Sequence, residues 1–560
     1  MTNSTDVAEP PAVVKSKHSH HDKYTDITTA YYIFAFLLIG VPVWWKSTAI
    51  HRAYIPFHEI VELHNSNVSQ LIHVLLMVDD SSIDIDPLSA SISEANAIRD
   101  SNVNSAHLRF SYSWNIRRVS KNAEDVILNS KSLSSLDDNF KTLLEGVTAD
   151  IVVVLSKSFP AHPRAIVGGH RTVFVSSVEK DLLVLARYLV KSVVYSVVRE
   201  DVFRSISQPF SSEERKRPTK EQQRSLHASP SVDVVITCVV PQPQVIDVTW
   251  NSEAAYNAYM KPVVNRLKHV VQLNLKTQFK FGHAIKLHTE KNPESGGFQI
   301  RHDKLALLIN QFEKLLPGQV SQSPVLNFIV YTVPKEISPL HIIDEEGRKL
   351  ESNAFISPRW GGVMFYNVEF HGASDGMQKV ALDSRKIYQV LLTQIRPLLG
   401  VPEKSSAMEF DTHFRRDGAV FSDWEIDFMM RRRAHDYLSA TARILHSLAD
   451  LVNKIGNMVI NENVGQLTVA SVASARNALR LLDQGHLESA MASAEDAFTA
   501  SEKAFFDPSL LGLLYFPDDQ RYAIYVPLFV PTLYPIIFST GLIARYIYSF
   551  CLRWRKQKFE

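Results

Sequence analysis

Cysteine is scarce in this sequence, which has only two cysteines in 560 residues. So few cysteines exclude a fold built on disulfides and any cysteine-rich zinc module. An excess of either charge is missing too, because 60 Lys and Arg stand against 59 Asp and Glu, for a formal net charge of +1. Nucleic-acid-binding domains usually carry a clear basic excess. The composition therefore argues against nucleic acid as a partner.

Known catalytic motifs are absent as well. The sequence contains no Gly-x-Ser-x-Gly elbow of serine hydrolases, no His-Glu-x-x-His metal motif and no phosphate-binding P-loop. Cys238 lies in the apolar run VDVVITCVV, where burial favours the neutral thiol over the reactive thiolate. We expect Cys238 to pack in a core strand. We accordingly predict no catalytic residue, no metal ligand and no cofactor in this chain.

Two long uncharged runs are present, one of 19 residues at 27–45 and one of 23 residues at 522–544. At about 1.5 Å per residue, the shorter run extends roughly 28 Å, close to the thickness of the hydrocarbon core of a bilayer. The first run ends in Trp44, Trp45 and Lys46, which is typical of an interfacial anchor and not of a signal-peptide cleavage site. We therefore predict two transmembrane helices.

The C-terminal tail indicates how these helices are oriented, because basic tails stay in the cytosol. Two spans put both tails, 1–26 and 545–560, on the cytosolic side and residues 46–521 together in the lumen. The basic residues of the tails are candidates for holding an anionic lipid headgroup; they are Lys23, Arg553, Arg555, Lys556 and Lys558. Lys556 and Lys558 also fit a K-x-K-x-x signal for retrieval to the endoplasmic reticulum.

The large domain alternates apolar, β-branched runs with amphipathic stretches. The runs predict strands at 71–78, 150–155, 172–176, 232–240, 270–281, 325–332 and 362–368, and the stretches predict helices at 179–198, 254–269, 303–316 and 384–399. This alternation predicts an α/β fold over about 70–400, with a mixed sheet covered by helices. The polar stretch 207–231 is expected to be an exposed loop. From about 424 to 505, Ala-rich and Leu-rich helical spacing predicts a C-terminal α-helical subdomain.

Two short motifs of the large domain are candidate sites. Asn67-Val68-Ser69 is an N-glycosylation sequon, so we predict that Asn67 carries a glycan. The segment SPRWGG at 357–362 combines a proline with a glycine pair, which predicts a tight turn. Trp360 in this turn is either a core side chain or, together with Arg359, an anchor of a partner interface.

The second uncharged run contains Pro527, Pro531 and Pro535, which share one helix face at a four-residue spacing. Interior prolines cost about 3 kcal/mol each in helices, or roughly 9 kcal/mol together. The eleven Leu, Ile, Phe and Val residues of the run contribute only about 3 to 7 kcal/mol in favour of insertion. Neighbouring helices can satisfy the carbonyls that prolines leave free. We predict that the proline face contacts other membrane helices, with a simple kink as the alternative.

Four segments carry a family resemblance, in order from the first predicted helix to the last: VPVWWKSTAIHRAYIPF, VLNFIVYTVP, NAFISPRWGGVMFYNV and AFFDPSLLGLLYFPDDQRYAIYVPLFVP. They resemble the S-subunit family of the GPI transamidase, the phosphatidylinositol-glycan biosynthesis class S proteins. The resemblance implies a non-catalytic, structural subunit of an endoplasmic-reticulum membrane complex that replaces a C-terminal signal peptide with a GPI anchor. It also implies that the K, T, U and GPI-attachment protein subunits are partners and that the catalytic cysteine belongs to the K subunit. The residues alone leave a membrane-anchored lumenal hydrolase or glycosyltransferase, or a glycan-binding adaptor, as alternatives.

Overall fold

The computed structural model describes most of the chain. The described residues are 28, 31–48, 51–101, 107–130, 132–143, 149–160, 164–207, 209–211, 223–291, 297–316, 321–370, 377–402, 412–414, 420–455, 458–511 and 518–557. They divide into two compact units. The first comprises Met1–Ile55, Ser447–Gln466 and Lys503–Glu560, and the second comprises Pro56–His446 and Leu467–Glu502.

The second unit contains a six-stranded sheet with the strand order β16-β4-β5-β3-β1-β2. Its strands are β1 (Val68–Val78), β2 (Leu108–Arg118), β3 (Ile151–Ser156), β4 (Ala165–Val167), β5 (Thr172–Ser176) and β16 (Thr412–Phe414). β1 pairs in parallel with β2 and β3, and β3 with β5, whereas β4 runs antiparallel to β5. β3 and β5 are buried along their whole length, which explains why they appear in the sequence as continuous apolar runs.

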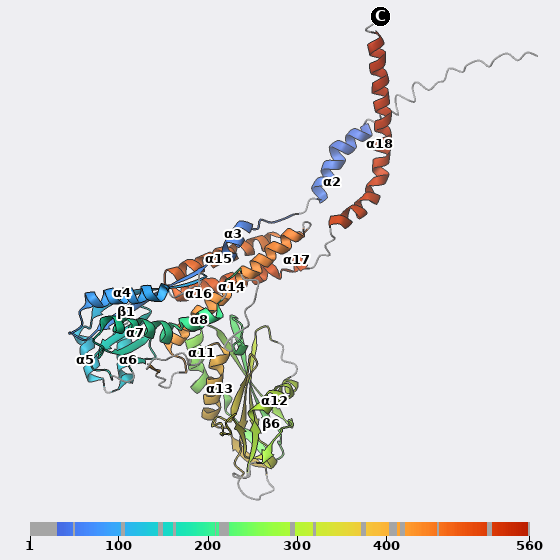
Figure 1. Cartoon of the computed structure of the whole chain (residues 1–560). Coiled ribbons are helices and arrows are strands. Elements are labelled where there is room, and N and C mark those ends of the chain that lie inside the picture. The colour runs from blue at the N-terminus through green and yellow to red at the C-terminus, as the bar shows by residue number, and fades with distance from the viewer. Residues whose placement is uncertain are drawn as a thin grey trace, which may run out of the picture. The chain divides into compact units, whose positions relative to one another are not determined.

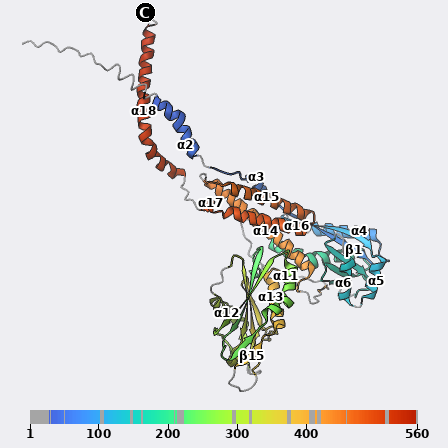
Figure 2. The same cartoon turned by 180° about the vertical axis from the view of Figure 1, so that it is seen from behind.

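Helices cover both faces of this sheet. They are α4 (Ile85–Ser101), α5 (Lys121–Asn129), α6 (Leu133–Leu143), α7 (Leu182–Lys191) and α8 (Glu200–Ile206). β1 connects through α4 to β2 on one side, and β2 connects back through α5 and α6 to β3 on the other side of β1. Right-handed crossovers therefore put α4 on the opposite face from α5 and α6, as Figures 1 and 2 show.

A second sheet in the same unit has five strands in the order β13-β14-β11-β6-β8. Its strands are β6 (Ser231–Val240), β8 (Gln272–Phe281), β11 (Val325–Thr332), β13 (Ala354–Ser357) and β14 (Gly361–Tyr366). All neighbours pair in parallel except β13, which runs antiparallel to β14. β13 and β8 are thus the edge strands of this sheet.

The second sheet also has a helix layer on each face. α12 (His302–Leu315) packs on one face, where Leu305 and Phe312 join a core with Tyr331 and Phe365. The other face carries α13 (Ser384–Leu398), which lies beside α10 (Ser252–Ala255), together with α11 (Lys261–Leu267). Figure 1 shows α12 and α13 on opposite sides of β6. Two small sheets complete this part: β9 (Glu290–Lys291), β10 (Phe298–Arg301) and β12 (Leu340–Ile343), and the pair β7 (Ile246–Thr249) and β15 (Gln378–Ala381).

The first turns of α14 (Asp423–Lys454) connect the two sheets of the second unit. Asp427 accepts hydrogen bonds from Arg171, at the start of β5, at 2.6 and 2.7 Å. Asp423 accepts a hydrogen bond from Arg266, in α11, at 2.6 Å. Carboxylates in the first turn also interact favourably with the helix dipole. These ion pairs fix α14 against elements of both sheets.

The C-terminal helices α15 (Glu462–Asp483) and α16 (Leu487–Phe505) confirm the predicted helical subdomain. Fully buried alanines let these helices approach closely; they are Ala475, Ala478, Ala490, Ala494 and Ala497. Ser471 in α15 donates a hydrogen bond to the carbonyl oxygen of Ala497 in α16 at 2.7 Å. Gly485, with φ at 81°, adopts the left-handed conformation that the turn between the two helices requires.

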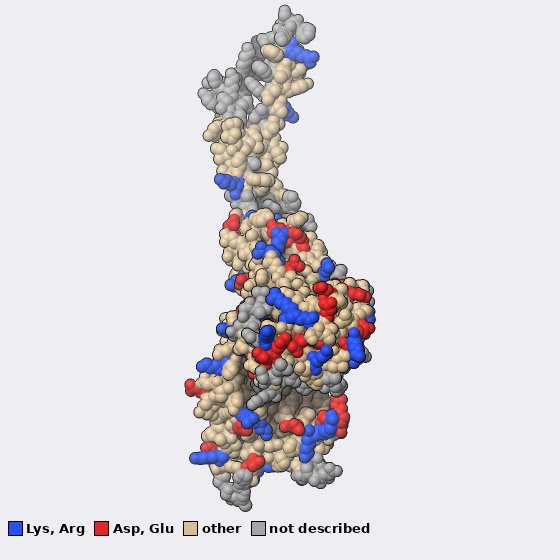
Figure 3. All heavy atoms as spheres, turned by 90° about the vertical axis from the view of Figure 1, so that its left-hand side faces the viewer, with Lys and Arg blue, Asp and Glu red and all other residues tan. Residues whose placement is uncertain are grey.

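The first unit contains α2 (Val41–Thr48), α17 (Pro508–Leu511) and α18 (Asp518–Gln557). Within this unit, Arg52 donates a hydrogen bond to the carbonyl oxygen of Val452 at 2.8 Å, and the N–H of Ala53 donates to the carbonyl oxygen of Ile460 at 2.9 Å. Figure 3 shows few charged side chains in the upper region, where α2 and α18 lie. Within the described residues, no helix is both long and apolar enough to cross a membrane. The two spans, 27–45 and 522–544, stay predictions.

All seven predicted strands are present, and the mixed α/β class is confirmed. Two predicted helices change character along their length. At 179–198, α7 begins after the cap Asp181, and the π-helical segment Ser192–Val198 follows it. At 254–269, the π-helical segment Tyr256–Met260 separates α10 from α11. The expectation of an exposed loop at 207–231 holds at some described residues, such as Pro209 and His227, and is wrong at others. Phe210 and Ser225 are only 3% and 2% exposed, because the chain packs there against α14. Residues 208 and 212–222 lie outside the described residues.

Candidate functional site

A groove of about 840 Å³ lies at the β13 edge of the five-stranded sheet. α12 lines it with Leu305 and Ile309, α13 lines it with Val390, and β13 contributes Phe355 and Ile356. The two helices reach the groove from opposite faces of the sheet, so the edge strand lies between them. Pockets of this volume with a mainly apolar lining are typical of binding sites.

Charged side chains also line this groove. Arg224 and Lys386 contribute two positive charges and Glu351 contributes one negative charge. The Nζ atom of Lys386 also lies 5.6 Å from the centroid of the Tyr366 ring. The arrangement can bury apolar groups of a ligand while attracting a negative one. This groove was not predicted from the sequence, although β13 leads directly into the predicted turn SPRWGG at 357–362.

The predicted turn follows β13 directly and is confirmed. Gly361 has φ at 143°, and a Cβ atom there would lie 1.8 Å from the backbone oxygen of Asn327, so only glycine fits. Trp360 is half-buried and packs against the core that includes α12, which supports the core interpretation of this residue. Arg359 is exposed, with φ at 59°, next to Pro358 of the groove lining. A partner interface at Arg359 and Trp360 stays a prediction.

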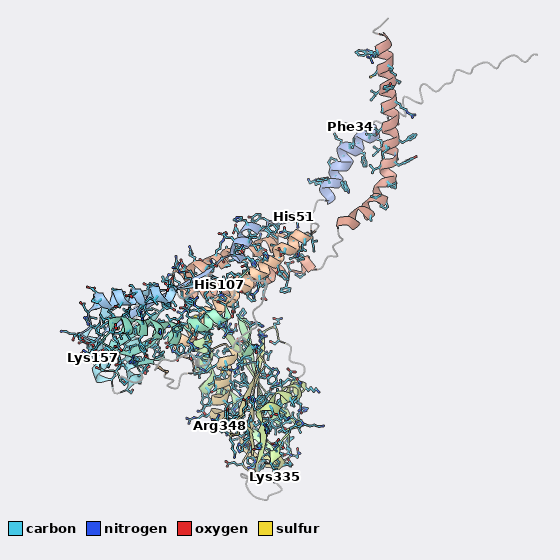
Figure 4. All side chains as sticks on the ribbon, in the orientation of Figure 1. Phe34, His51, His107, Lys157, Lys335 and Arg348 are labelled. Atoms are coloured by element: carbon cyan, nitrogen blue, oxygen red, sulfur yellow. The ribbon has the colours of Figure 1, made fainter. Side chains whose placement is uncertain are left out.

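A polar cluster that was not predicted from the sequence lies at the carboxyl edge of the six-stranded sheet. Doubly wound sheets usually bind ligands at this edge. Asp80, just after β1, accepts hydrogen bonds from the backbone N–H of Ser82 at 2.9 Å and from the Ser177 hydroxyl at 2.8 Å. Lys157 Nζ lies 2.8 Å from Asp80 Oδ1, and Figure 4 labels this lysine.

These contacts neutralise the cluster from within the chain. Burial opposes ionisation of Asp80, but the hydrogen bonds from Lys157, Ser82 and Ser177 outweigh it and hold the pKa of this carboxyl well below its usual range. The ammonium group of Lys157 thus balances the charge of the Asp80 carboxylate, so the carboxylate needs no bound cation. Within the described part of the chain, no three His, Cys, Asp or Glu side chains form a group that could hold a metal ion.

Cys238 lies in β6 and is completely buried, as predicted. Burial raises the pKa of its thiol to about 12. Because a nucleophilic cysteine reacts as the thiolate, this side chain stays unreactive at physiological pH. The other cysteine, Cys551, is exposed near the end of α18.

Asn67 lies in the short connection between α3 (Phe57–His64) and β1, and its side chain is exposed. An oligosaccharide could be attached there without displacing core residues. Glycosylation of Asn67 stays a prediction.

The three prolines of the second uncharged run lie inside α18 and are exposed in this chain. Large apolar side chains of the same helix are exposed as well, among them Ile537 at 70% and Phe538 at 63%. Figures 1 and 2 show α18 bent towards its N-terminal end, as a proline kink would produce. Extended apolar surfaces mark contacts with a partner or with lipid, so helix contacts of the proline face stay a prediction.

The basic tail residues are only partly described. Arg553, Arg555 and Lys556 lie in the last turns of α18, and the Arg555 side chain is exposed. Lys23 and Lys558 lie outside the described residues. The described site residues belong to separate elements: the connection before β1, the turn after β13, and α18.

This chain is similar to known proteins of one family. Residues 31–549 match the family described as phosphatidylinositol-glycan biosynthesis class S protein. The GPI-anchor transamidase component PIGS of Rattus norvegicus is 30% identical over 518 residues, which are 90% of this chain and 92% of the relative. The Homo sapiens protein of the same name is 29% identical over 519 residues, with the same coverage. The GPI transamidase component PIG-S homolog of Schizosaccharomyces pombe is 23% identical over 89% of this chain and 80% of its own. The chain therefore belongs to the phosphatidylinositol-glycan biosynthesis class S protein family.

Proposed function

We propose that this chain is a non-catalytic, structural subunit of the GPI transamidase of the endoplasmic reticulum. This complex removes the C-terminal signal peptide of a protein and attaches a preassembled GPI anchor in its place. The observation that carries the proposal is the family match over residues 31–549, together with relatives that are named as transamidase components.

The chemistry of Cys238 supports a non-catalytic role. Attack on a peptide carbonyl by a cysteine requires a thiolate, whose pKa is lowered by a neighbouring cation or helix N-terminus. Cys238 is completely buried, and its pKa is raised to about 12. The nucleophile of the complex then belongs to another subunit, the cysteine-protease-like K subunit.

The proposed topology has two transmembrane helices, 27–45 and 522–544. Support comes from the absence of charge in both runs and from α18, which continues as one helix through the whole of the second run. The basic residues Arg553 and Arg555 favour a cytosolic C-terminus. Both tails are then cytosolic and residues 46–521 are lumenal, which puts the exposed Asn67 in the compartment where N-glycosylation occurs.

The proposed partners are the K, T, U and GPI-attachment protein subunits, with an anionic phospholipid at the cytosolic ends of the spans. The exposed proline face of α18 supplies a surface for packing against other membrane helices.

Affinity purification of the tagged full chain in a mild detergent, followed by mass spectrometry, tests this assignment. We expect the other transamidase subunits to be recovered together, and we expect the chain purified without them to have no hydrolase or transferase activity. Recovery of the chain alone, or catalysis by the chain alone, would show that the assignment is wrong and would favour a lumenal enzyme.

A further inference from the structure

We propose that the groove at the β13 edge binds an extended peptide segment of a partner protein, which adds to the five-stranded sheet as a further strand. The inference depends on the geometry of this groove and not on the assignment to the transamidase. Three observations carry it: the unpaired edge of β13, the arrangement of apolar walls around it, and the charge of the lining.

Among the described residues, the backbone of β13 pairs with a strand on one side only, because β13 ends the sheet and its neighbour is β14. The N–H of Phe365 donates to the carbonyl oxygen of Asn353 at 3.0 Å. Residues of an antiparallel pair alternate between bonding to the partner strand and facing away from it. Ala354 and Ile356 therefore direct their N–H and C=O groups away from β14, and both residues line the groove.

The walls of the groove fit the side chains of an extended strand. Such a strand directs alternate side chains to opposite faces, and here one face meets α12 and the other meets α13. Leu305 and Ile309 of α12 and Val390 of α13 offer apolar surface on these two sides. A helix in the groove would leave the polar groups of the β13 edge unsatisfied, because its own backbone groups are already bonded internally.

The charge of the lining defines the peptide further. Arg224 and Lys386 outnumber Glu351 as charged groups of the groove, whereas Lys and Asp or Glu are interspersed on the face of the molecule that Figure 3 shows. A peptide with apolar residues at alternate positions and at least one acidic residue is complementary to this lining. Strand addition of this kind obtains affinity from main-chain hydrogen bonds and specificity from pockets for alternate side chains.

The test uses the full chain in detergent and a library of random octapeptides displayed on phage. Ala306 of α12 lines the groove, so Ala306→Trp fills it; Leu307 on the same helix is 55% exposed and is not part of the lining, so Leu307→Trp is the matched control. We expect peptides with an acidic residue and alternating apolar residues to be enriched. Measured by fluorescence anisotropy with the synthetic peptides, binding should weaken at least tenfold in Ala306→Trp and less than twofold in Leu307→Trp.

Two modified peptides distinguish strand addition from other modes of binding. N-methylation of the amides that face β13 should weaken binding at least tenfold, whereas N-methylation of the intervening amides should change it little. A peptide in which lysine replaces the acidic residue should bind the wild-type chain more weakly than the original peptide does. The same lysine peptide should bind the Lys386→Glu variant more tightly than it binds the wild type. The proposal is wrong if no peptide is enriched on the wild type relative to Ala306→Trp, or if N-methylation has the same effect at every position. The proposal would also be contradicted if the wild type enriched no peptide but bound a phosphorylated mannose glycan, and if Ala306→Trp lost that glycan binding.

Discussion

Arg171 donates two hydrogen bonds to the carboxylate of Asp427, from Nε at 2.6 Å and from Nη2 at 2.7 Å. Arg171 comes just before β5, and Asp427 lies in the second turn of α14. Burial opposes the charge of Arg171, but the carboxylate of Asp427 outweighs burial and raises the pKa of the guanidinium. This two-bond pair attaches α14 to the six-stranded sheet.

Removal of Arg171 should destabilise the chain, because the nearly buried carboxylate of Asp427 loses two charge-assisted hydrogen bonds and keeps only the more distant charge of Arg431. We expect Arg171→Met to lower the free energy of unfolding by roughly 2 kcal/mol, less than the value of about 3–5 kcal/mol for fully buried pairs, since the Arg171 side chain is 44% exposed. The control is Arg164→Met, whose side chain is 55% exposed and lies 3.9 Å from Glu179. Denaturant unfolding measures both changes. Equal destabilisation by the two variants would show that the pair has no special role.

Acid should weaken the attachment of α14 through Asp423. Burial would raise the pKa of Asp423, but the contacts with His170 at 2.9 Å and with Arg266 at 2.6 Å outweigh burial and lower it. A carboxyl with a lowered folded-state pKa stabilises the fold above its unfolded pKa of about 4, and this stability is lost as pH falls through the folded-state pKa. Between about pH 6 and pH 3 the wild type should therefore lose more stability than Asp423→Asn. Denaturant midpoints followed by tryptophan fluorescence check this, and parallel pH profiles would contradict it.

The sequence predicted the buried strands best. β5 and β11 match their predicted bounds because continuous β-branched runs mark strands that are buried on both faces. β2 was not predicted, because its sequence LRFSYSWNIRR mixes polar and aromatic residues and contains no continuous apolar run. This composition is explained by its position at the edge of the sheet, where one side of the strand is exposed.

The groove could not be predicted, because it needs three elements that are separated in sequence. α12, β13 and α13 meet only once the chain has folded, and no motif marks their meeting point. The same reason hides Arg171 and Asp427, which are 256 positions apart. The single residues Cys238 and Gly361 were easier to interpret, since an apolar run and a glycine pair are local signals.

Cys238 should be dispensable for chemistry. With a pKa of about 12 and no exposed surface, its thiol should resist maleimide at neutral pH in the folded chain, whereas the exposed Cys551 should react. Cys238→Ala should cost about 1 kcal/mol of stability. Mass spectrometry of the labelled chain measures both thiols. Loss of GPI-anchored reporters from the surface of cells that express a folded, assembled Cys238→Ala variant would assign catalysis to this chain.

The proline face of α18 should contact transmembrane helices of partner subunits. Replacing Pro527, Pro531 and Pro535 with leucine should leave membrane insertion intact, because leucine favours both helix and lipid. Recovery of partner subunits in mild detergent should nevertheless decrease. The control is Gly541→Leu in the same helix, where an added Cβ meets nothing within 4 Å. Unchanged recovery of partner subunits with the triple variant would show that the proline face does not bind them.

The last residues should direct retrieval to the endoplasmic reticulum. A reporter carrying residues 545–560 should stay in that compartment, and changing Lys556 and Lys558 to serine should let it reach later compartments. The physical alternative is a basic tail that only sets membrane orientation. Glycan maturation on the reporter measures the difference, and continued retention of the serine variant would exclude a dilysine signal.

The central claim is that the chain is a necessary, non-catalytic component of GPI attachment. Its most direct test is to delete the gene from its own cells and to follow a GPI-anchored reporter protein. We expect the reporter to accumulate as a precursor that retains its C-terminal signal peptide, and we expect the wild-type chain and Cys238→Ala both to restore the anchored form. Normal anchoring of the reporter in the deleted cells would contradict the account.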